Sequence, residues 1–150
     1  MVDNSDDAGW RERVQSSFAK QGLMRTMNAV LSIEAPGAVE IAICADPGLT
    51  QQHGFIHGGA VGAIADSAAG FAALSVMPRG TGVLTTEFKI NFVAPAAGDR
   101  IVARGRVVKS GRTLTLAQTE VFAENNGQTK LIALLTATLM TIEDRPGISD

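Results

Sequence analysis

The longest hydrophobic run of the chain covers residues 58–77 and has no polar face. Its side chains are small, mostly alanine and glycine, and they surround a single carboxylate, Asp66. A segment of this length that is apolar on all sides predicts a helix buried in the centre of the domain. Burying an uncompensated charge would cost several kcal/mol, so Asp66 must be hydrogen-bonded, paired or functional.

A second helix-like pattern lies near the N-terminus. Apolar side chains recur there every four residues: Trp10, Val14 and Phe18. The pattern predicts a helix over about 8–21, with Asp7 as its N-cap and Gly22 at its end. Its apolar stripe is expected to pack against the body of the domain rather than bind a ligand. Residues 23–27 fit either a turn or a further short piece of helix.

The remaining segments have the pattern of β-strands. They are rich in β-branched residues or alternate between apolar and polar ones, and turn sequences such as Pro36-Gly37 and Asn126-Gly127 separate neighbours. In the clearest case, Phe88, Ile90 and Phe92 lie on one face, which is typical of a half-buried strand. The predicted strands are 29–35, 39–45, 84–93, 101–109, 113–123 and 130–142.

The order of these elements is helix, two strands, long helix and four strands. Consecutive strands joined by tight turns indicate an antiparallel sheet in an α+β fold. Because the long helix is apolar on all sides, the sheet is expected to curl around it. We expect a single domain over 1–150, with 1–7 and 144–150 flexible.

The composition is that of a soluble globular protein. Apolar residues make up 45% of the chain and charged residues 19%, and a net charge of −2 gives no broad electrostatic attraction to nucleic acid or anionic membranes. The acidic N-terminus is unlike a secretory signal, and the long helix lacks the basic flanks and aromatic belts of a membrane span. We therefore expect a cytoplasmic protein.

Cys44 is the one cysteine of the chain, which excludes an intrachain disulfide and a cysteine-based zinc site. Its place in a strand-like run predicts a small buried thiol rather than a nucleophile. His53 and His57 have the spacing of a zinc-binding pair, but such a pair needs a helix and a third ligand. The neighbouring glycines favour a loop instead, so no metal is expected.

The loop before the long helix carries the most specific pattern. It reads Gln51-Gln52-His53-Gly54-Phe55-Ile56-His57-Gly58-Gly59, and Asp66 follows nine residues after His57. This pattern resembles the hotdog-fold acyl-CoA thioesterases of the phenylacetic-acid-degradation (PaaI) type, and the resemblance extends in element order over about residues 25–142. It implies a curled antiparallel sheet wrapped around one long central helix, hydrolysis of an acyl- or arylacyl-CoA thioester, and no cofactor.

The resemblance also implies a role for individual residues. Asp66 corresponds to the catalytic carboxylate, which acts as nucleophile or general base, and Gln51 to the amide that orients water or the thioester. His57 and Gly58 correspond to the loop whose backbone N–H polarises the thioester carbonyl, and Thr85 to a hydroxyl residue that orients the attacking water. The further residues expected to contact the substrate are Gly59, His53, Phe55 and, beside the CoA phosphates, Arg112.

Helix geometry separates the two halves of this site. Nine residues of helix rise about 13 Å, and about two and a half turns place His57 and Asp66 on opposite sides. They cannot reach one substrate carbonyl within one subunit, so the site is expected to lie between two subunits, as in hotdog dimers. We predict a dimer that assembles further into a homotetramer. The pKa of Asp66 is expected to be raised by burial and lowered by hydrogen bonds.

Two other functions use the same fold. A non-catalytic module would bind acyl-CoA without releasing CoA, although it has no need of both Gln51 and Asp66. An enoyl-CoA hydratase would use an Asp-His pair in another arrangement. The acyl group is not determined by the sequence, because it depends on the orientation of Phe55, Phe71 and Met77.

Overall fold

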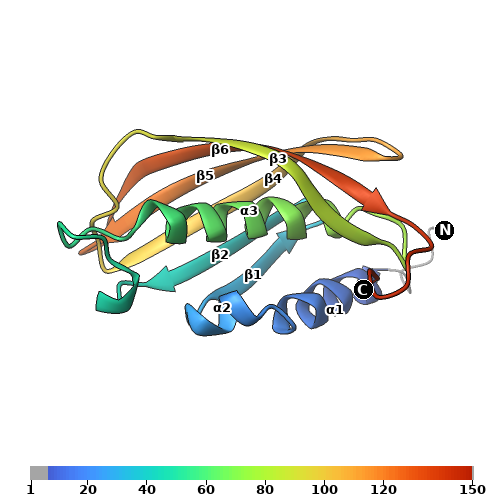
Figure 1. The fold of residues 1–150 in the computed structure, drawn as a ribbon, viewed down its shortest axis with the longest axis horizontal. Coiled ribbons are helices and arrows are strands. Elements are labelled where there is room, and N and C mark those ends of the chain that lie inside the picture. Colours follow the sequence, from blue (N-terminus) through green and yellow to red (C-terminus); the bar gives the residue numbers. More distant parts are fainter. Residues whose placement is uncertain (1–6, 150) are drawn as a thin grey trace.

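The computed structural model describes residues 7–149, in which a sheet curls around one long helix (Figure 1). Residues 1–6 and 150, for which the sequence predicts flexibility, lie outside the described part. The helices are α1 (Asp7–Ala19), α2 (Gly22–Thr26), the short 3-10 helix η1 (Pro47–Leu49) and the central α3 (Gly58–Leu74). The strands are β1 (Val30–Ala35), β2 (Ala38–Cys44), β3 (Gly82–Phe92), β4 (Arg100–Ser110), β5 (Leu114–Asn125) and β6 (Gln128–Ile142).

The strand order in the sheet is β1-β2-β4-β5-β6-β3, and every neighbouring pair is antiparallel. This confirms the predicted α+β fold, and the observed strands differ from the predicted ones by one or two residues at their ends. The central helix ends at Leu74, three residues before the end of the apolar run. Among the described helices, none is long and apolar enough to cross a membrane. The cytoplasmic location stays a prediction.

α3 lies close to the inner face of the sheet because small residues let the two backbones approach. Ala65 and Ala68 are fully buried, and Gly105 of β4 faces the helix: a Cβ atom at Gly105 would lie 2.5 Å from the Ala68 carbonyl carbon. On β5, the Thr119 hydroxyl donates a hydrogen bond of 3.0 Å to the Ala65 carbonyl oxygen. These contacts position the middle of α3, and with it Asp66, relative to the sheet.

α1 and α2 lie along the side of α3 that the sheet leaves open (Figure 1). Val14 is fully buried, and the Phe18 ring meets the Phe71 ring edge to face with centroids 5.6 Å apart. This confirms that the N-terminal apolar stripe packs against the body of the domain. The Arg13 guanidinium donates to three carbonyl oxygens around the end of α3, those of Leu74, Met77 and Pro78. Leu74 is the last residue of α3, so its carbonyl oxygen is one of the acceptors that a helix end leaves without a helical partner.

The N-terminal helix differs from its prediction at both ends. Asp7 is the first residue of α1 rather than a cap before it, and α1 ends at Ala19. Gly22 does not end a helix but begins α2, so the ambiguous segment 23–27 is mostly helical. The chain changes direction at Gln21, whose backbone is extended with φ −73° and ψ 110°, and this allows a new helix to start directly after it.

β3 is an edge strand of the sheet, paired on one side with β6. A β-bulge at Thr86 shifts its register, so that Thr85 before the bulge and the predicted face of Phe88, Ile90 and Phe92 after it both point towards α3. Phe88 and Phe92 are nevertheless 47% and 54% exposed. They keep this exposure because no further strand of the described chain covers that edge.

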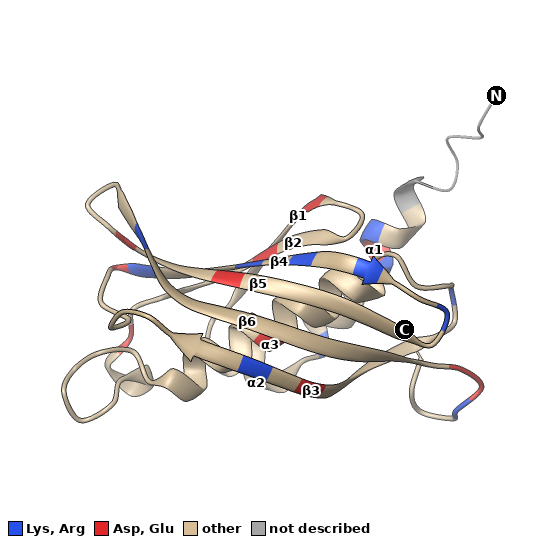
Figure 2. Ribbon diagram, turned by 90° about the horizontal axis from the view of Figure 1, so that it is seen from above, with Lys and Arg blue, Asp and Glu red and all other residues tan. Residues whose placement is uncertain are grey.

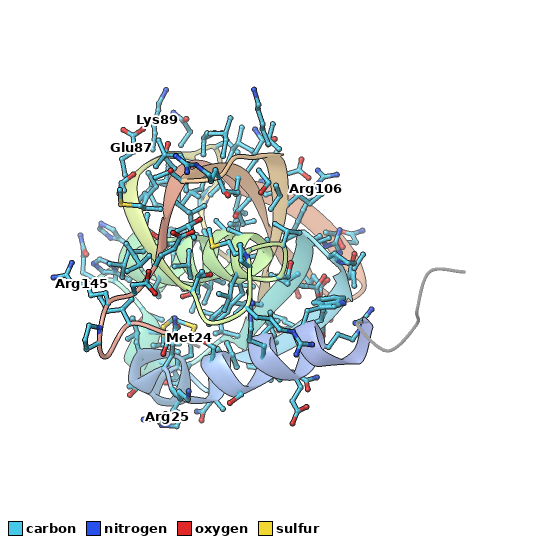
Figure 3. The ribbon with its side chains drawn as sticks, turned by 90° about the vertical axis from the view of Figure 1, so that its right-hand side faces the viewer. Met24, Arg25, Glu87, Lys89, Arg106 and Arg145 are labelled. Carbon is cyan, nitrogen blue, oxygen red and sulfur yellow. The ribbon has the colours of Figure 1, made fainter. Side chains whose placement is uncertain are left out.

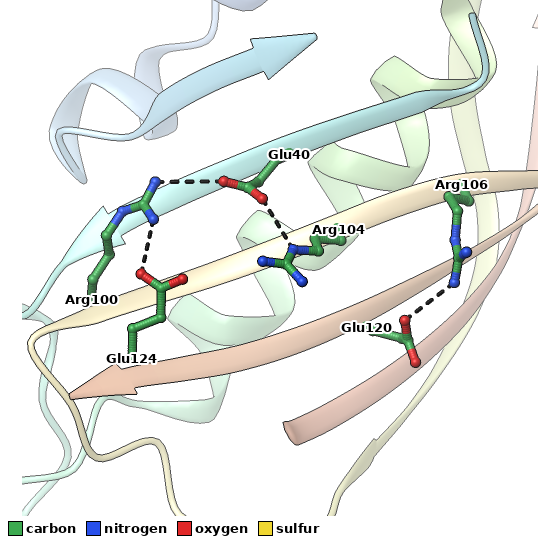
Figure 4. Close-up of polar contacts among 6 residues, drawn as sticks. All are labelled: Glu40, Arg100, Arg104, Arg106, Glu120 and Glu124. Atoms are coloured by element: carbon green, nitrogen blue, oxygen red, sulfur yellow. Dashed lines mark hydrogen bonds and ion pairs between the residues drawn. The ribbon is translucent and has the colours of Figure 1, made fainter. Parts of the chain in front are cut away.

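A network of ion pairs joins β2, β4 and β5 on the outer face of the sheet (Figure 4). Glu40 lies between Arg100 and Arg104, at 3.5 and 3.1 Å. The other pairs are Arg100–Glu124 at 2.9 Å and Arg106–Glu120 at 3.2 Å. Pairs with this exposure contribute about 0–1 kcal/mol each to stability. They therefore mark a solvated surface rather than a functional site.

Charged side chains on the outer face of the sheet point away from α3. Glu87, Lys89 and Arg106 extend outward from the sheet, whereas Met24 lies between the helices and the sheet (Figure 3). Within α3 the only charged residue is Asp66. The helix itself lies beneath the strands when the sheet is seen from above (Figure 2).

The thiol of Cys44 is exposed, so its predicted burial is wrong. Alternation along β2 places Val39, Ile41 and Ile43 on the buried inner face. Cys44 is the last residue of the strand and falls on the other side, opposite Arg100 of β4. A strand-like run does not reveal on its own which alternate residues face the core.

Candidate functional site

Asp66 lies halfway along α3, on the side that faces the start of β3. The Thr85 hydroxyl donates a hydrogen bond of 2.8 Å to its Oδ1 atom. The β-bulge at Thr86 places the Thr85 side chain on the face of β3 that is turned towards α3. The structure thus brings two of the predicted site residues together. The second carboxylate oxygen, Oδ2, has no hydrogen-bond partner among the described residues.

Burial raises the pKa of the Asp66 carboxyl above its ordinary value, because the ionised form loses hydration between α3 and β3. The hydrogen bond from Thr85 lowers this pKa, since it stabilises the carboxylate, but it is the smaller effect. A partly dehydrated carboxylate with one oxygen held and the other free has the properties of a general base or a nucleophile.

A pocket of about 320 Å³ opens beside Asp66, between α3 and the start of β3. Phe71 lines this pocket, in keeping with its predicted influence on the acyl group. Met77, which has the same predicted influence, is buried in the core and does not line it. Asp66 is the only charged side chain among the described residues of the lining.

Two walls of this pocket come from segments to which the sequence assigns no function. Ser17 and Gln21 belong to the N-terminal helical region, and the Ser67 hydroxyl donates a hydrogen bond of 3.2 Å to Gln21 Oε1. Ile148, in the C-terminal tail, lies directly against Gly82 at the start of β3. The four-residue spacing of Ser17 and Gln21, beside the apolar stripe, is a sequence signal for the first wall. The tail carries no such signal.

Hydrogen bonds in the loop before α3 leave one backbone N–H free at the start of the helix. The His57 N–H donates to the Leu49 carbonyl oxygen at 2.8 Å. The His57 ring is the N-cap of α3, and its Nδ1 atom accepts from the Gly59 N–H at 2.7 Å. The Gly58 N–H has no acceptor among the described residues. Gly58 is therefore the predicted donor that is available to a ligand.

Gln51 lies in a tight turn that fixes its side chain. Its backbone N–H donates to the Phe55 carbonyl oxygen at 2.9 Å, and its side-chain Oε1 accepts from the His53 N–H. With Oε1 occupied, the NH₂ group is the part of the Gln51 amide that can donate to a ligand. A groove of about 460 Å³ runs past Gln51, Phe55, Gly58 and Phe92.

The other predicted contacts lie outside both spaces. The His53 ring lies 3.4 Å from the Gln52 amide nitrogen, and Gly59 borders a different groove, beside α2. Arg112 is exposed in the β4–β5 turn and lines neither the Asp66 pocket nor the groove that runs past Gln51 and Gly58, called the Gly58 groove below. Its contact with CoA phosphates stays a prediction. Within residues 7–149, no group of three or more His, Cys, Asp or Glu side chains is arranged to hold a metal.

Within one chain, the Asp66 pocket and the Gly58 groove are separate. They have no lining residue in common, and eight residues of α3 hold Gly58 and Asp66 about 12 Å apart along the helix axis. Both spaces nevertheless border β3. The pocket includes Thr85 near the start of this strand, and the groove includes Phe92 at its end.

Known proteins share this sequence and architecture. Residues 53–130 match the Thioesterase superfamily. Mouse acyl-coenzyme A thioesterase 13 is 30% identical over 128 residues, which cover 82% of this chain and 87% of the mouse protein. The crystal structure of a thioesterase family protein from Silicibacter pomeroyi superimposes with a TM-score of 0.88 at 47% identity, covering 89% of this chain and 98% of that one.

The Escherichia coli PaaI protein, from the phenylacetic acid degradation operon, shares the fold, with a TM-score of 0.80 at 20% identity over 91% of this chain and 95% of that one. The order of strands and the central helix carrying Asp66 agree with this likeness. The chain therefore belongs to the thioesterase superfamily: it is a thioester hydrolase with a hotdog fold of the PaaI type.

Proposed function

We propose that this protein hydrolyses acyl- or arylacyl-CoA thioesters to the free acid and CoA, with Asp66 as the catalytic carboxylate. Asp66 carries the proposal, because it is a partly buried charge in an otherwise apolar helix, held by Thr85 through one oxygen and beside a pocket. Burying a carboxylate opposes folding, so its presence there favours a functional role. The name of the mouse relative, acyl-coenzyme A thioesterase 13, supports CoA as the leaving group.

We infer that the reaction takes place between two copies of the chain. β3 is an edge strand on which Phe88 and Phe92 are about half exposed, and such edges pair readily with another strand. Antiparallel pairing of β3 with its counterpart, about a two-fold axis, puts the start of one strand beside the end of the other. The Asp66 pocket of one copy would then adjoin the Gly58 groove of the second copy. Further assembly into a homotetramer stays a prediction.

Each copy supplies different chemistry in this arrangement. The free N–H of Gly58, at the positive end of α3, donates to the thioester oxygen as negative charge develops there. The NH₂ group of Gln51 donates a second hydrogen bond, which orients the thioester or the water. Asp66 acts from the opposite side as nucleophile or general base, and Thr85 holds the position of its carboxylate.

Two routes fit these roles. As a nucleophile, Asp66 adds to the carbonyl carbon, the C–S bond breaks with its electron pair on the CoA sulfur, and water cleaves the resulting mixed anhydride. As a general base, Asp66 takes a proton from water while the water oxygen adds to the carbonyl carbon. The C–S bond then breaks with its electron pair on the CoA sulfur, which takes the proton held by Asp66, so that the free acid and the CoA thiol are released. The hydrogen bond from Thr85 fixes Oδ1 in both routes.

Substitution of Asp66 tests the catalytic assignment. CoA release from acetyl-, hexanoyl- and phenylacetyl-CoA is followed with a thiol reagent, and the oligomer is checked by size-exclusion chromatography. Asp66→Ala is expected to lower kcat/KM by about 10²–10⁴-fold with the oligomer intact. Asp99→Ala, which removes an exposed carboxylate elsewhere, is the control. Equal activity of Asp66→Ala and wild type would refute the assignment.

The same assays distinguish the other functions of this fold. Wild-type protein that binds acyl-CoA tightly without releasing thiol would be a non-catalytic binding module. Formation of a 3-hydroxyacyl product from an enoyl-CoA would indicate a hydratase.

Mixing two inactive variants tests whether the site is shared between copies. Asp66→Ala and Gln51→Ala remove groups from the two different halves. A mixed dimer contains one site with both defects and one site with neither, so random exchange of subunits should restore about a quarter of the wild-type activity. No recovery after subunit exchange, verified by mass spectrometry, would place all the groups of one site in a single copy.

A further inference from the structure

Gly70 is an unusual residue at its position in α3. It lies in the interior of the helix, four residues and therefore about one turn after Asp66, and it lines the pocket beside that carboxylate. Glycine is among the least favourable residues for a helix interior, because it has the most backbone freedom to lose. A reason other than helix formation is therefore needed for it.

Close packing does not supply that reason. Among the described residues, a Cβ atom built at Gly70 would meet only the Leu139 Cδ2 atom, at 3.7 Å, which is an ordinary van der Waals contact. Gly105 is the opposite case, because a Cβ atom there would lie 2.5 Å from the Ala68 carbonyl carbon. The fold thus requires a glycine at Gly105 but not at Gly70. What the missing side chain of Gly70 leaves is open volume in the Asp66 pocket.

The charge of the pocket indicates which part of the substrate enters this volume. None of the described residues that line it is a lysine or arginine, and its one charge is the carboxylate of Asp66. The phosphates of CoA would be repelled there, since such groups are bound by basic side chains or free N–H donors. A pocket of about 320 Å³ is also near the lower limit for small-molecule sites. It suits an uncharged acyl group.

The dimensions of the pocket limit the length of that acyl group. Gly70 lies about 6 Å beyond Asp66 along the helix axis, and Leu74, also in the lining, about 12 Å beyond it. An extended carbon chain advances about 1.3 Å per bond, so about six to ten carbons span this distance. Across the pocket, Ile148 of the tail forms a wall by lying against Gly82, where a Cβ atom would meet its Cγ2 atom at 2.6 Å.

We propose that Gly70 and Ile148 determine which size of acyl group the enzyme accepts. The Asp66 pocket would hold an uncharged acyl chain of about six to ten carbons, or a ring-containing acyl group of similar overall length. This inference rests on the thioesterase activity proposed above. Gly70 admits the part of the chain that lies beyond the thioester carbonyl, and Ile148 blocks a longer chain from passing under the tail.

The acyl-length profile of matched variants tests this proposal. The kcat/KM values for acetyl-, hexanoyl-, decanoyl- and palmitoyl-CoA are measured for wild type, Gly70→Ala, Gly70→Val and Ile148→Ala. Wild type is expected to prefer hexanoyl- and decanoyl-CoA. Gly70→Val should lower the hexanoyl-to-acetyl ratio by about tenfold or more, with a smaller decrease for Gly70→Ala. Ile148→Ala should change the profile in the opposite direction, raising the palmitoyl-to-hexanoyl ratio.

Gly62→Ala is the control, because Gly62 lies one turn before Asp66 in the same helix and outside the pocket lining. A Cβ atom there would have no neighbour within 4 Å in the part of the chain that the structure describes. This variant should keep the wild-type length profile. A Gly70→Val profile parallel to that of wild type would overturn the proposal while leaving the thioesterase activity established. Absence of hydrolysis with every thioester would instead overturn the proposed function.

Discussion

Gly105→Ala is the substitution that most directly tests how the fold holds the site. Gly105 lies on the inner face of β4, opposite the middle of α3. A Cβ atom there would lie 2.5 Å from the Ala68 carbonyl carbon and 2.9 Å from the Ala69 nitrogen. Both are backbone atoms of a buried helix, so neither can move aside by a change of rotamer. The helix as a whole must move away from the sheet.

The size of the movement follows from ordinary contact distances. Carbon atoms in contact lie about 3.5–4.0 Å apart, so α3 must retreat by about 1 Å at Ala68. Overpacking of this kind destabilises a protein by about 1–3 kcal/mol. For a chain of this length, each kcal/mol lowers the melting temperature by about 2–4 °C.

The displacement should also affect catalysis, because Asp66 is only two residues from Ala68 in α3. A shift of α3 relative to β3 lengthens the hydrogen bond between Thr85 and Asp66. A misplacement of about 1 Å can lower the rate of an enzyme about 10²-fold. Thermal unfolding followed by circular dichroism and CoA release from hexanoyl-CoA measure the two effects.

Gly62→Ala is again the matched control, since it adds the same methyl group at a position with open space around it. It should raise the melting temperature, because alanine favours a helix by about 1 kcal/mol over glycine. If Gly105→Ala melts within about 1 °C of wild type and keeps its activity, close approach of α3 to β4 does not hold the site in position.

Three further substitutions give independent tests. Thr85→Val removes the hydrogen bond that lowers the pKa of Asp66, so the acid limb of kcat/KM against pH should move to higher pH; an unchanged limb would contradict the role of Thr85. Burial raises the pKa of Asp66 in the folded protein, so the protonated carboxyl favours the folded state. This contribution to stability is fully present below the ordinary carboxyl pKa and is lost as the pH rises through the raised value. Asp66→Asn should therefore melt higher than wild type at neutral pH, with the difference decreasing in acid; a lower melting temperature at neutral pH would refute this reasoning. Thr115→Val replaces a fully buried hydroxyl that has no partner among the described residues, and should stabilise the protein by about 1 kcal/mol in urea unfolding, whereas destabilisation would indicate an unseen partner.

Local patterns of the sequence were sufficient for most of the fold. The all-apolar run around Asp66 predicts a central helix, and the turn pairs Pro36-Gly37 and Asn126-Gly127 separate strands that are neighbours in the observed sheet. These features depend on residues close together in the chain, so the sequence displays them directly. β3 does not follow chain order, because it pairs with β6 and not with β4. The resemblance of the Gln51–Gly59 loop to PaaI-type thioesterases then identified the family.

The side to which a residue points was less predictable. Cys44 belongs to a strand-like run but lies on its exposed side, since the face that meets the core depends on where the other strands pair. Thr85 and Phe88 both face α3 although they are three positions apart in the strand, and only the bulge at Thr86 makes this consistent with alternation.

Some features of the site follow from the sequence, and others only from the tertiary structure. The sequence alone determined that Asp66 is an isolated charge in an apolar helix and that Gly58 begins that helix, because both follow from neighbouring residues and helix geometry. Only the tertiary structure decided that Gly58, and not His57 or Gly59, keeps a free N–H. It also placed the C-terminal tail in the wall of the Asp66 pocket. Such contacts join segments far apart in the chain, and their geometry exists only once the sheet has closed around α3.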